Sequence, residues 1–354
     1  MKFFEGLTVI ELASVLAGPA TGMFFSELGA KVIKVENPLT SGDVTRHWKL
    51  PTESPSSSIS AYYSSVNYKK EVVFIDLNSE SGKNKLYKLV LKADIIILNY
   101  KQGDAIKLGM DYNTLKSINP KIIYAFLEGF PKGIKRVAFD VVLQAETGFM
   151  SMNGTTESGP IKMPVALIDV LTAHQLKQAI LLALLHRERT GKGSIVSTTL
   201  YESAIASLVN QASNYLMQGV VPQPMGSLHP NIAPYGETFK TKDNKSIVLA
   251  IGNDKQFKKL CHTLSIEEKD IFKSNTERIK NRSPLFETIS SAIKKYKSKE
   301  IMKKFEAEDI PAGLIKNLEE VFNQAELKNM ILEEENQGQL TKTVKSIAFK
   351  SDFL

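Results

Sequence analysis

The chain of 354 residues has a single cysteine, Cys261, which excludes an intrachain disulfide and favours a cytoplasmic location. Its first ten residues lack the basic start, long apolar stretch and cleavage site of a secretory signal. No uninterrupted apolar run is long enough to cross a bilayer. From these absences we expect a protein of the cytoplasm with no membrane partner.

Several signatures of catalysis and nucleotide binding are also missing. The chain has no G-x-S-x-G, no G-x-x-x-x-G-K-[ST] and no G-x-G-x-x-G, which argues against a hydrolase serine, a P-loop and a dinucleotide site. Its five histidines lack the spacing of metal ligands, so we expect no metal. The net charge is +7, but the lysines are spread along the chain, so we expect no nucleic-acid partner.

The length of the chain predicts two domains, because a single core seldom grows beyond about 250–300 residues. Hydrophobic residues make up 43% and charged residues 23%, as in an ordinary globular protein. The composition shifts to Gly, Pro and Gln around residues 219–234. We therefore expect a large domain over residues 1–218 and a small domain from residue 219 onward.

Strand-like and helix-like patterns alternate over the first 130 residues, which indicates βαβ units and a mostly parallel, doubly wound sheet. Ligands of such sheets bind at the carboxyl ends of the strands. Later in the chain we expect a helix over 201–216, a hairpin over 237–251 that turns at Asp243-Asn244, and helical segments over 255–328. The expected early strands are 7–12, 31–36, 71–77, 94–98 and 121–127, with helices over 20–28 and 81–92.

Asp169 directly precedes a long apolar-periodic stretch that ends at Arg187, Arg189 and Gly191. Local sequence therefore predicts that Asp169 is the N-cap of a helix. A capping aspartate can also be functional, because the helix dipole stabilises its charge. Both interpretations stay open on local sequence.

An ordered set of motifs resembles the class III CoA-transferases of the CaiB/BaiF type, a superfamily that also contains α-methylacyl-CoA racemase. Each motif is weak alone, but the set runs in one order along essentially the whole chain. The opening match is residues 6–46, GLTVIELASVLAGPATGMFFSELGAKVIKVENPLTSGDVTR. Further matches are NYKK at 67–70 with IDL at 75–77, NY at 99–100, AFD at 138–140, ID at 168–169, RTGKG at 189–193 and IPAG at 310–313.

The resemblance implies an α/β fold, with a large Rossmann-like CoA-binding domain over 1–218 and a smaller α+β domain over 219–328. It also implies a segment over 329–354 that returns toward the large domain, and an interlocked homodimer. Coenzyme A or acyl-CoA is then a substrate, with no permanently bound cofactor. The chain stops soon after Phe349, where family members usually continue, so an impaired or non-catalytic acyl-CoA-binding relative is an alternative.

By the same resemblance, Asp169 is the catalytic carboxylate that moves CoA from an acyl-CoA to a carboxylic acid through an aspartyl anhydride. Backbone N–H groups near Gly129 and the 226–227 turn are expected to stabilise the oxyanion. Leu16 stands where formyl-CoA enzymes have glutamine, which argues against oxalate or formate. The implied CoA contacts are Val15, Leu16 and Ala17 at the thioester arm, Leu77 and Asn78 near the adenine, and Asn99 and Lys107 near the phosphates.

A 2-methylacyl-CoA racemase is the second alternative, since it shares this fold. Racemization needs acid/base groups on both faces of the α-carbon. Phe139 stands where racemases have histidine before the aspartate of their HD pair, which favours a transferase. Asp254 is present in the region of the second racemase carboxylate, but its GND context is transferase-like.

Overall fold

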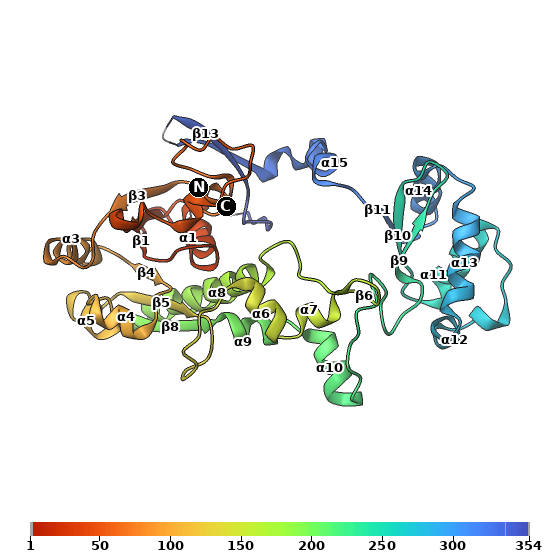
Figure 1. The fold of residues 1–354 in the computed structure, drawn as a ribbon, viewed down its shortest axis with the longest axis horizontal. Helices are drawn as coiled ribbons and strands as arrows, with labels where there is room; N and C mark the ends of the chain where they lie inside the picture. The colour runs from red at the N-terminus through yellow and green to blue at the C-terminus, as the bar shows by residue number, and fades with distance from the viewer. Residues whose placement is uncertain (1–2, 337, 353–354) are drawn as a thin grey trace. The chain divides into compact units, whose positions relative to one another are not determined.

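The structure is a computed structural model that describes residues 3–336 and 338–352. The described chain divides into two compact units, which we call unit 1 and unit 2. Unit 2 comprises Gly154–Gly159 and Pro224–Lys328, and unit 1 comprises the rest. Both units combine helices with strands (Figure 1).

Unit 1 is built on a six-stranded parallel sheet with the order β3-β2-β1-β4-β5-β8. This confirms the prediction of an α/β fold with a parallel sheet. The chain runs outward from β1 to β3 and then reverses to β4, so the switch point of the topology lies between β1 and β4. The strands are β1 (Thr8–Glu11), β2 (Lys31–Glu36), β3 (Lys70–Phe74), β4 (Ile95–Leu98), β5 (Ile123–Glu128) and β8 (Ser194–Thr199).

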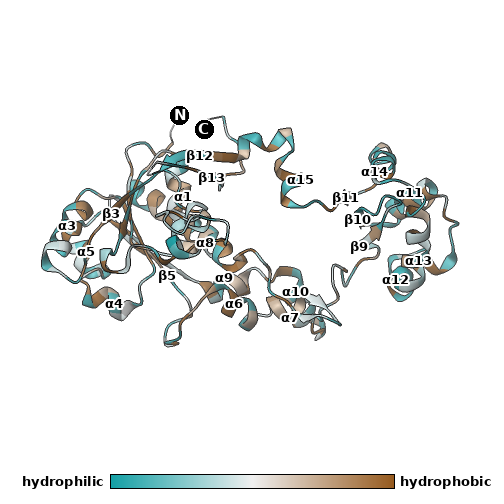
Figure 2. Cartoon of the chain, turned by 45° about the horizontal axis from the view of Figure 1, so that its top comes forward, coloured by the Kyte–Doolittle hydropathy of each residue, from teal (hydrophilic) through white to brown (hydrophobic). Residues whose placement is uncertain are grey.

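Both faces of this sheet are covered by helices, which explains why its central strands read as continuous apolar runs. Val9 and Ile97 belong to a core shared with α1 and α8, whereas Ile10 and Ile96 belong to a core shared with α3 and α5. The sheet strands are largely brown in Figure 2, and α3 and α5 carry both colours, as amphipathic helices do. The bounds are α1 (Ala17–Glu27), α3 (Glu80–Val90), α5 (Tyr112–Ile118) and α8 (Leu167–Thr190).

One helix of unit 1 differs from its prediction. The helix expected over 201–216 is two helices, because Val209 has a positive φ of 43° that a continuous α-helix does not allow. The helices are α9 (Leu200–Ala206) and α10 (Val209–Gln218). The shorter elements of this unit are α2 (Ala61–Ser64), α4 (Gln102–Lys107), α6 (Asp140–Glu146), α7 (Phe149–Met152), and the 3-10 helices η1 (Pro38–Thr40) and η2 (Val44–His47).

Helix α8 is long and apolar enough to cross a membrane by length and composition alone. Core helices of soluble proteins pass the same test. Here Ile168, Leu176 and Ile180 are fully buried in the core that α8 shares with the sheet. The helix therefore serves as a core element of unit 1.

Unit 2 contains an antiparallel sheet of order β11-β10-β9. The hairpin of its first two strands turns at Asn244, whose φ is 57°, which confirms the predicted turn. β11 was missed because its three residues lie within a stretch that reads as helical. The elements are β9 (Tyr235–Lys240), β10 (Ser246–Ala250), β11 (Ala312–Leu314), α11 (Asp254–Leu264), η3 (Asp270–Phe272), α12 (Asn275–Lys280), α13 (Arg282–Ile293), α14 (Ser298–Ala307) and α15 (Leu318–Phe322), with η4 (Ala325–Met330) at the return to unit 1 and the short pair β6 (Gly154–Thr155) and β7 (Gly159–Pro160).

The last segment of the chain is a hairpin of β12 (Ile331–Asn336) and β13 (Gln339–Val344), which packs on unit 1 beside α1 (Figure 1). Leu332 packs on a small core formed by Met23, Val66 and Tyr68. Beyond the hairpin, the Ser346 N–H donates to the Glu27 carboxylate at 2.8 Å. The C-terminal residues thus contribute to the packing of the N-terminal helix.

A buried ionic network joins the carboxyl end of β1, the middle of β2 and the first residue of β3. Glu11 lies opposite Lys34 in the sheet register, and the Lys34 ammonium is 3.0 Å from the Glu11 carboxylate and 3.0 Å from that of Asp43. Lys70 approaches Glu11 from β3 at 2.7 Å. Burial alone would lower the pKa of Lys34, but Glu11 and Asp43 outweigh it and raise that pKa. Burial lowers the pKa of Lys70 to about 8 against the attraction of Glu11.

We expect Lys34→Met to destabilise the protein strongly, because it leaves Asp43 buried without its cation. Breaking a buried pair costs about 3–5 kcal/mol. The control is Lys31→Met on the same strand, whose ion pair with Glu71 is exposed on both sides. Exposed pairs contribute about 0–1 kcal/mol. Urea unfolding compares the two, and equal losses would contradict a central role for the network.

Candidate active site

The turn that follows β1 adopts a strained conformation at Val15, whose φ is 71°. A β-branched residue rarely enters the left-handed region, so the surrounding contacts must hold it there. The Lys34 ammonium donates to the Ala13 carbonyl at 2.8 Å. The Asn99 side chain accepts from the Ser14 N–H at 3.2 Å and donates to the Ser14 carbonyl at 3.0 Å. The turn is thus held by strands on both sides of the switch point.

Asp43 makes the contact to Val15 itself. Its carboxylate oxygens accept from the Val15 N–H at 3.4 and 3.3 Å. The same carboxylate accepts from the N–H of Thr45 at 3.0 Å and from its hydroxyl at 2.8 Å. Burial would raise the pKa of Asp43, but Lys34 and the Thr45 N–H outweigh it and lower that pKa. Asp43 is therefore a permanent anion beneath the turn.

Asp169 lies within the first turn of α8 and is not its N-cap, so the capping prediction was wrong. The helix begins at Leu167, and the N-cap position is Ala166, which has no capping side chain. Asp140, the first residue of α6, takes the capping role, since its carboxylate accepts from the N–H of Ile168 at 2.7 Å and of Asp169 at 3.4 Å. The helix starts earlier than predicted because a cap was supplied from another part of the chain.

The Asp169 side chain is buried but unpartnered. Its residue is 7% exposed, and within residues 3–336 and 338–352 its carboxylate has no hydrogen bond or ion pair. Burial, and then the charge of Asp140, raise the pKa of Asp169 to about 7. A carboxylate with such a pKa is a better nucleophile than an ordinary aspartate and is still partly ionised near neutral pH.

Asp140 is itself held in place by Gln144, whose amide donates to it at 2.6 Å. The side-chain carbonyl of Gln144 accepts from the Met163 N–H at 2.7 Å. The segment that leads into α8 is thereby tied to α6. Asp140 falls within a matched family motif, but the three-dimensional contacts are what assign its role and that of Gln144.

Tyr62 was missed in the sequence. The pKa of its phenol is raised by burial first, and then by the carboxylates of Asp169, Asp140 and Asp43. The phenol therefore remains a hydrogen-bond donor within electrostatic reach of Asp169. Its ring packs edge-on against Trp48 at 5.0 Å between centroids. Both aromatics lie in the irregular stretch between β2 and β3, where no periodic pattern marks them.

The predicted CoA-contact residues all follow the carboxyl ends of β1, β3 and β4. They differ in how free their side chains are. Leu77 is buried in the core and Ala17 is 4% exposed. Asn78 is exposed and bonds to Asp76 of its own turn. Lys107 is exposed, with a loose 4.0 Å ion pair to Asp104.

Asn99, predicted to lie near the phosphates, also bonds within the protein. Its amide is engaged on both sides by the Ser14 peptide, so it shapes the turn. Of the expected oxyanion donors, the Gly226 N–H already donates to the Gly154 carbonyl at 2.6 Å. Gly129 lies after β5, and its carbonyl accepts from the Tyr201 N–H at 3.0 Å.

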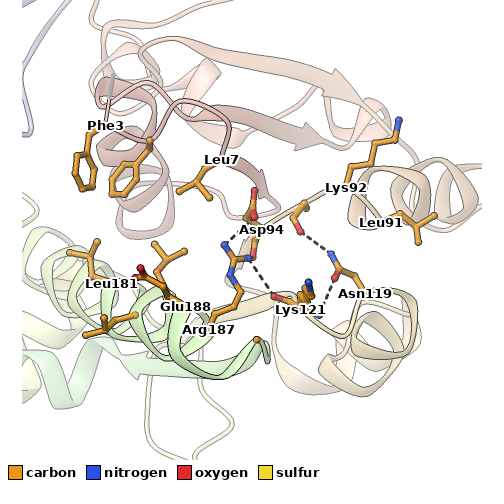
Figure 3. Close-up of a pocket in the computed structure, with 15 residues that line it drawn as sticks. Phe3, Leu7, Leu91, Lys92, Asp94, Asn119, Lys121, Leu181, Arg187 and Glu188 are labelled. Atoms are coloured by element: carbon orange, nitrogen blue, oxygen red, sulfur yellow. Dashed lines mark hydrogen bonds and ion pairs between the residues drawn. The ribbon is translucent and has the colours of Figure 1, made fainter. Parts of the chain in front are cut away.

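A cavity of about 780 Å³ lies at the amino ends of the sheet strands, opposite the carboxyl ends (Figure 3). Leu7, Asp94 and Lys121 line it where they precede β1, β4 and β5. Arg187, near the end of α8, pairs with Asp94 at 3.0 Å across it. Asp169 is near the start of the same helix, roughly 27 Å away by helix rise. The cavity is therefore separate from the candidate active site.

No group of three His, Cys, Asp or Glu that could hold a metal occurs within the described residues. The carboxylate of Asp169 is thus the chemically distinctive group of unit 1. Its position at the carboxyl side of a doubly wound sheet agrees with the ligand rule for such folds.

Comparisons with known proteins agree with this fold. The sequence model of CoA-transferase family III matches residues 4–353 of this chain. Succinate–glutarate CoA-transferase of Agrobacterium fabrum is 37% identical over 90% of this chain and 81% of its own length, and succinyl-CoA:glutarate CoA-transferase of Mus musculus is 33% identical over 92% and 75%. The crystal structure of a CAIB/BAIF family protein from Brucella suis superposes with a TM-score of 0.85, at 36% identity, over 99% of this chain and 93% of that one.

The fold and these matches define an enzyme of CoA transfer. The chain belongs to CoA-transferase family III. The predicted family resemblance and the predicted transferase class are both confirmed.

Asp169→Asn should stabilise the protein at high pH, the reverse of the loss expected for a cap. The folded pKa of about 7 lies above the ordinary value of 3.8, so the parent loses stability as pH rises through this window. The gain should be on the order of 2–4 kcal/mol at pH 8 and vanish near pH 4. Thermal unfolding at both pH values measures it.

The control is Asp111→Asn at the N-cap of α5, where hydrogen bonds from Thr114 and Asn113 outweigh burial and lower the pKa of Asp111. That variant should be less stable than the parent at neutral pH, and its loss should fade in acid. A destabilised Asp169→Asn at pH 8 would contradict the raised pKa.

Proposed function

We propose that this enzyme moves coenzyme A from an acyl-CoA to a carboxylic acid with Asp169 as nucleophile. The observation that supports this is the Asp169 carboxylate, buried, without a partner in the described chain, and with a raised pKa. A nucleophile that must be free to form and break acyl bonds cannot be committed to an ion pair. The buried carboxylate meets this requirement.

Each step exchanges one acyl bond for another. The Asp169 carboxylate attacks the thioester carbonyl and displaces the CoA thiolate, which gives an aspartyl anhydride. The thiolate then attacks the Asp169 carbonyl, which releases the donor acid and forms an aspartyl-CoA thioester. The acceptor carboxylate then attacks the aspartyl-CoA thioester, displaces the CoA thiolate and forms a second anhydride. The thiolate attacks the acceptor carbonyl of this anhydride, which gives the new acyl-CoA and regenerates the Asp169 carboxylate. No water is consumed, so the energy of the thioester is retained.

The substrates we propose are short dicarboxylates, with succinyl-CoA as donor and a five-carbon diacid as acceptor. Their support is that the relatives in Agrobacterium fabrum and Mus musculus are named for succinate and glutarate. For the CoA itself, we propose Val15, Leu16 and Ala17 at the thioester arm, Leu77 and Asn78 near the adenine, and Lys107 near the phosphates. Asn99 would act through the turn that it holds.

We propose that the enzyme is a cytoplasmic, interlocked homodimer. Its support is the apolar surface left uncovered on unit 1. Leu182 on α8 is 67% exposed, Leu216 and Met217 on α10 are 78% and 76% exposed, and Ile195 on the edge strand β8 is 47% exposed. Large apolar side chains left exposed on a unit's helices and edge strand favour an interaction surface. A second copy of the chain would cover them.

Incubation with succinyl-CoA should attach CoA to the peptide that contains Asp169, as detected by mass spectrometry. Asp169→Asn should form no adduct and should not transfer CoA to glutarate, because an amide is a poor nucleophile. Asp111→Asn controls for the loss of a carboxylate elsewhere and should still form the adduct. An adduct on another residue, or transfer by Asp169→Asn at the parent rate, would exclude Asp169 as nucleophile.

The same samples separate a transferase from a racemase. In deuterated water a 2-methylacyl-CoA should take up no α-deuterium, because Phe139 supplies no base. Rapid α-deuterium uptake without transfer between acids would favour the racemase alternative.

Light scattering should give the mass of a dimer for the parent protein. Met217→Glu on α10 should weaken the dimer, since it places a charge in the uncovered apolar surface. Leu91→Glu, at an exposed position that follows α3, is the matched control and should leave the mass unchanged. An active parent monomer would contradict the proposed assembly.

A further inference from the structure

The strained peptide at Val15 needs an agent that holds it. Its φ of 71° places a β-branched side chain where glycine, asparagine and aspartate are usually found. The residue itself does not favour this conformation, since valine is β-branched. The conformation must therefore be imposed by contacts from distant parts of the chain.

Within residues 3–336 and 338–352, three side chains bond to the turn, and one of them bonds to residue 15. Lys34 binds the Ala13 carbonyl and Asn99 binds the Ser14 peptide. Asp43 accepts from the Val15 N–H, at 3.3 and 3.4 Å from its two oxygens. The orientation of the Val15 peptide thus depends on where the Asp43 carboxylate lies.

That carboxylate is itself fixed before it meets Val15. The Asp43 N–H donates to the Glu36 carboxylate at 3.1 Å, and the Arg46 Nε–H donates to the same carboxylate at 2.7 Å. Tyr63 donates its hydroxyl to the same Glu36 carboxylate at 2.8 Å. Asp43 is 4% exposed. A buried carboxylate that is held by several hydrogen bonds is rigid enough to impose a strained conformation on a neighbouring peptide.

We propose that Asp43 is a positioning residue for CoA transfer, which holds the Val15 peptide in the left-handed conformation so that residues 15–17 are presented to the thioester. The inference rests on the proposed function of this turn. It adds a residue that touches neither substrate nor Asp169. A purely structural role, in which Asp43 only neutralises Lys34, is the competing explanation.

The two explanations separate through a substitution that removes the strain. Glycine adopts a φ near 71° without steric cost. If Asp43 acts by holding Val15, the loss of Asp43 should be partly repaired by Val15→Gly. If Asp43 only neutralises Lys34, glycine at residue 15 should repair nothing.

The experiment compares D43N, V15G and D43N/V15G in succinyl-CoA:glutarate transfer. Asparagine keeps the shape but presents an N–H₂ group or a weaker acceptor to the Val15 N–H. We expect D43N to lower kcat/KM roughly tenfold to a hundredfold, as a misplaced contact to the reacting group does. D43N/V15G should recover most of that loss.

The matched control is T45V, which removes a hydroxyl bonded to Asp43 without touching Val15. T45V should lower the thermal midpoint of unfolding. Adding V15G to T45V should not raise kcat/KM by the factor that adding V15G to D43N does. A D43N enzyme with parental kcat/KM would overturn the proposal. So would D43N activity that V15G fails to restore.

A crystal structure of D43N makes the outcome independent of the reaction. Residue 15 should leave the left-handed region in D43N, and a φ that stays near 71° would overturn the inference whatever the activity. If the parent transfers no CoA to any acid, the proposed function fails, and this φ still decides whether Asp43 holds Val15.

Discussion

The buried ionic network that joins β1, β2 and β3 is the constraint on which the rest of unit 1 depends. Glu11, Lys34 and Lys70 are almost fully removed from water, so each charge is tolerable only while its partners are in place. The network therefore forces three strands into one register and brings Asp43 beneath the turn that follows β1. Because a half-satisfied network is worse than none, the site is either assembled in full or absent.

The candidate site places two aspartates in opposite electrostatic settings. Asp43 faces a buried ammonium and two donors from Thr45, which lower its pKa, whereas Asp169 faces burial and a second carboxylate, which raise its own. Environments that push the pKa values of like groups apart commonly assign them different tasks. One carboxylate is committed to structure and the other is left free for chemistry.

The strands and the family could be predicted because local runs of residues carry both signals. β-branched runs mark β2 and β4, and the ordered motifs mark the family. The errors arose where a contact comes from far along the chain. Asp169 was taken for the N-cap because nothing in the local sequence shows that Asp140 supplies the cap. The bonds of Asn99 to Ser14 also escape local sequence, because the two residues lie 85 positions apart, and its expected place near the phosphates stays a prediction.

The hairpin of β12 and β13 has a consequence for how the chain is made. It packs on Met23 and Tyr68 of unit 1, although the whole of unit 2 is translated between them. Domains on a ribosome generally fold in the order in which they emerge. Here α1 waits for residues such as Ser346, which bonds to Glu27, until the whole of unit 2 has been translated. Unit 1 therefore begins to emerge from the ribosome before unit 2 and is finished after it.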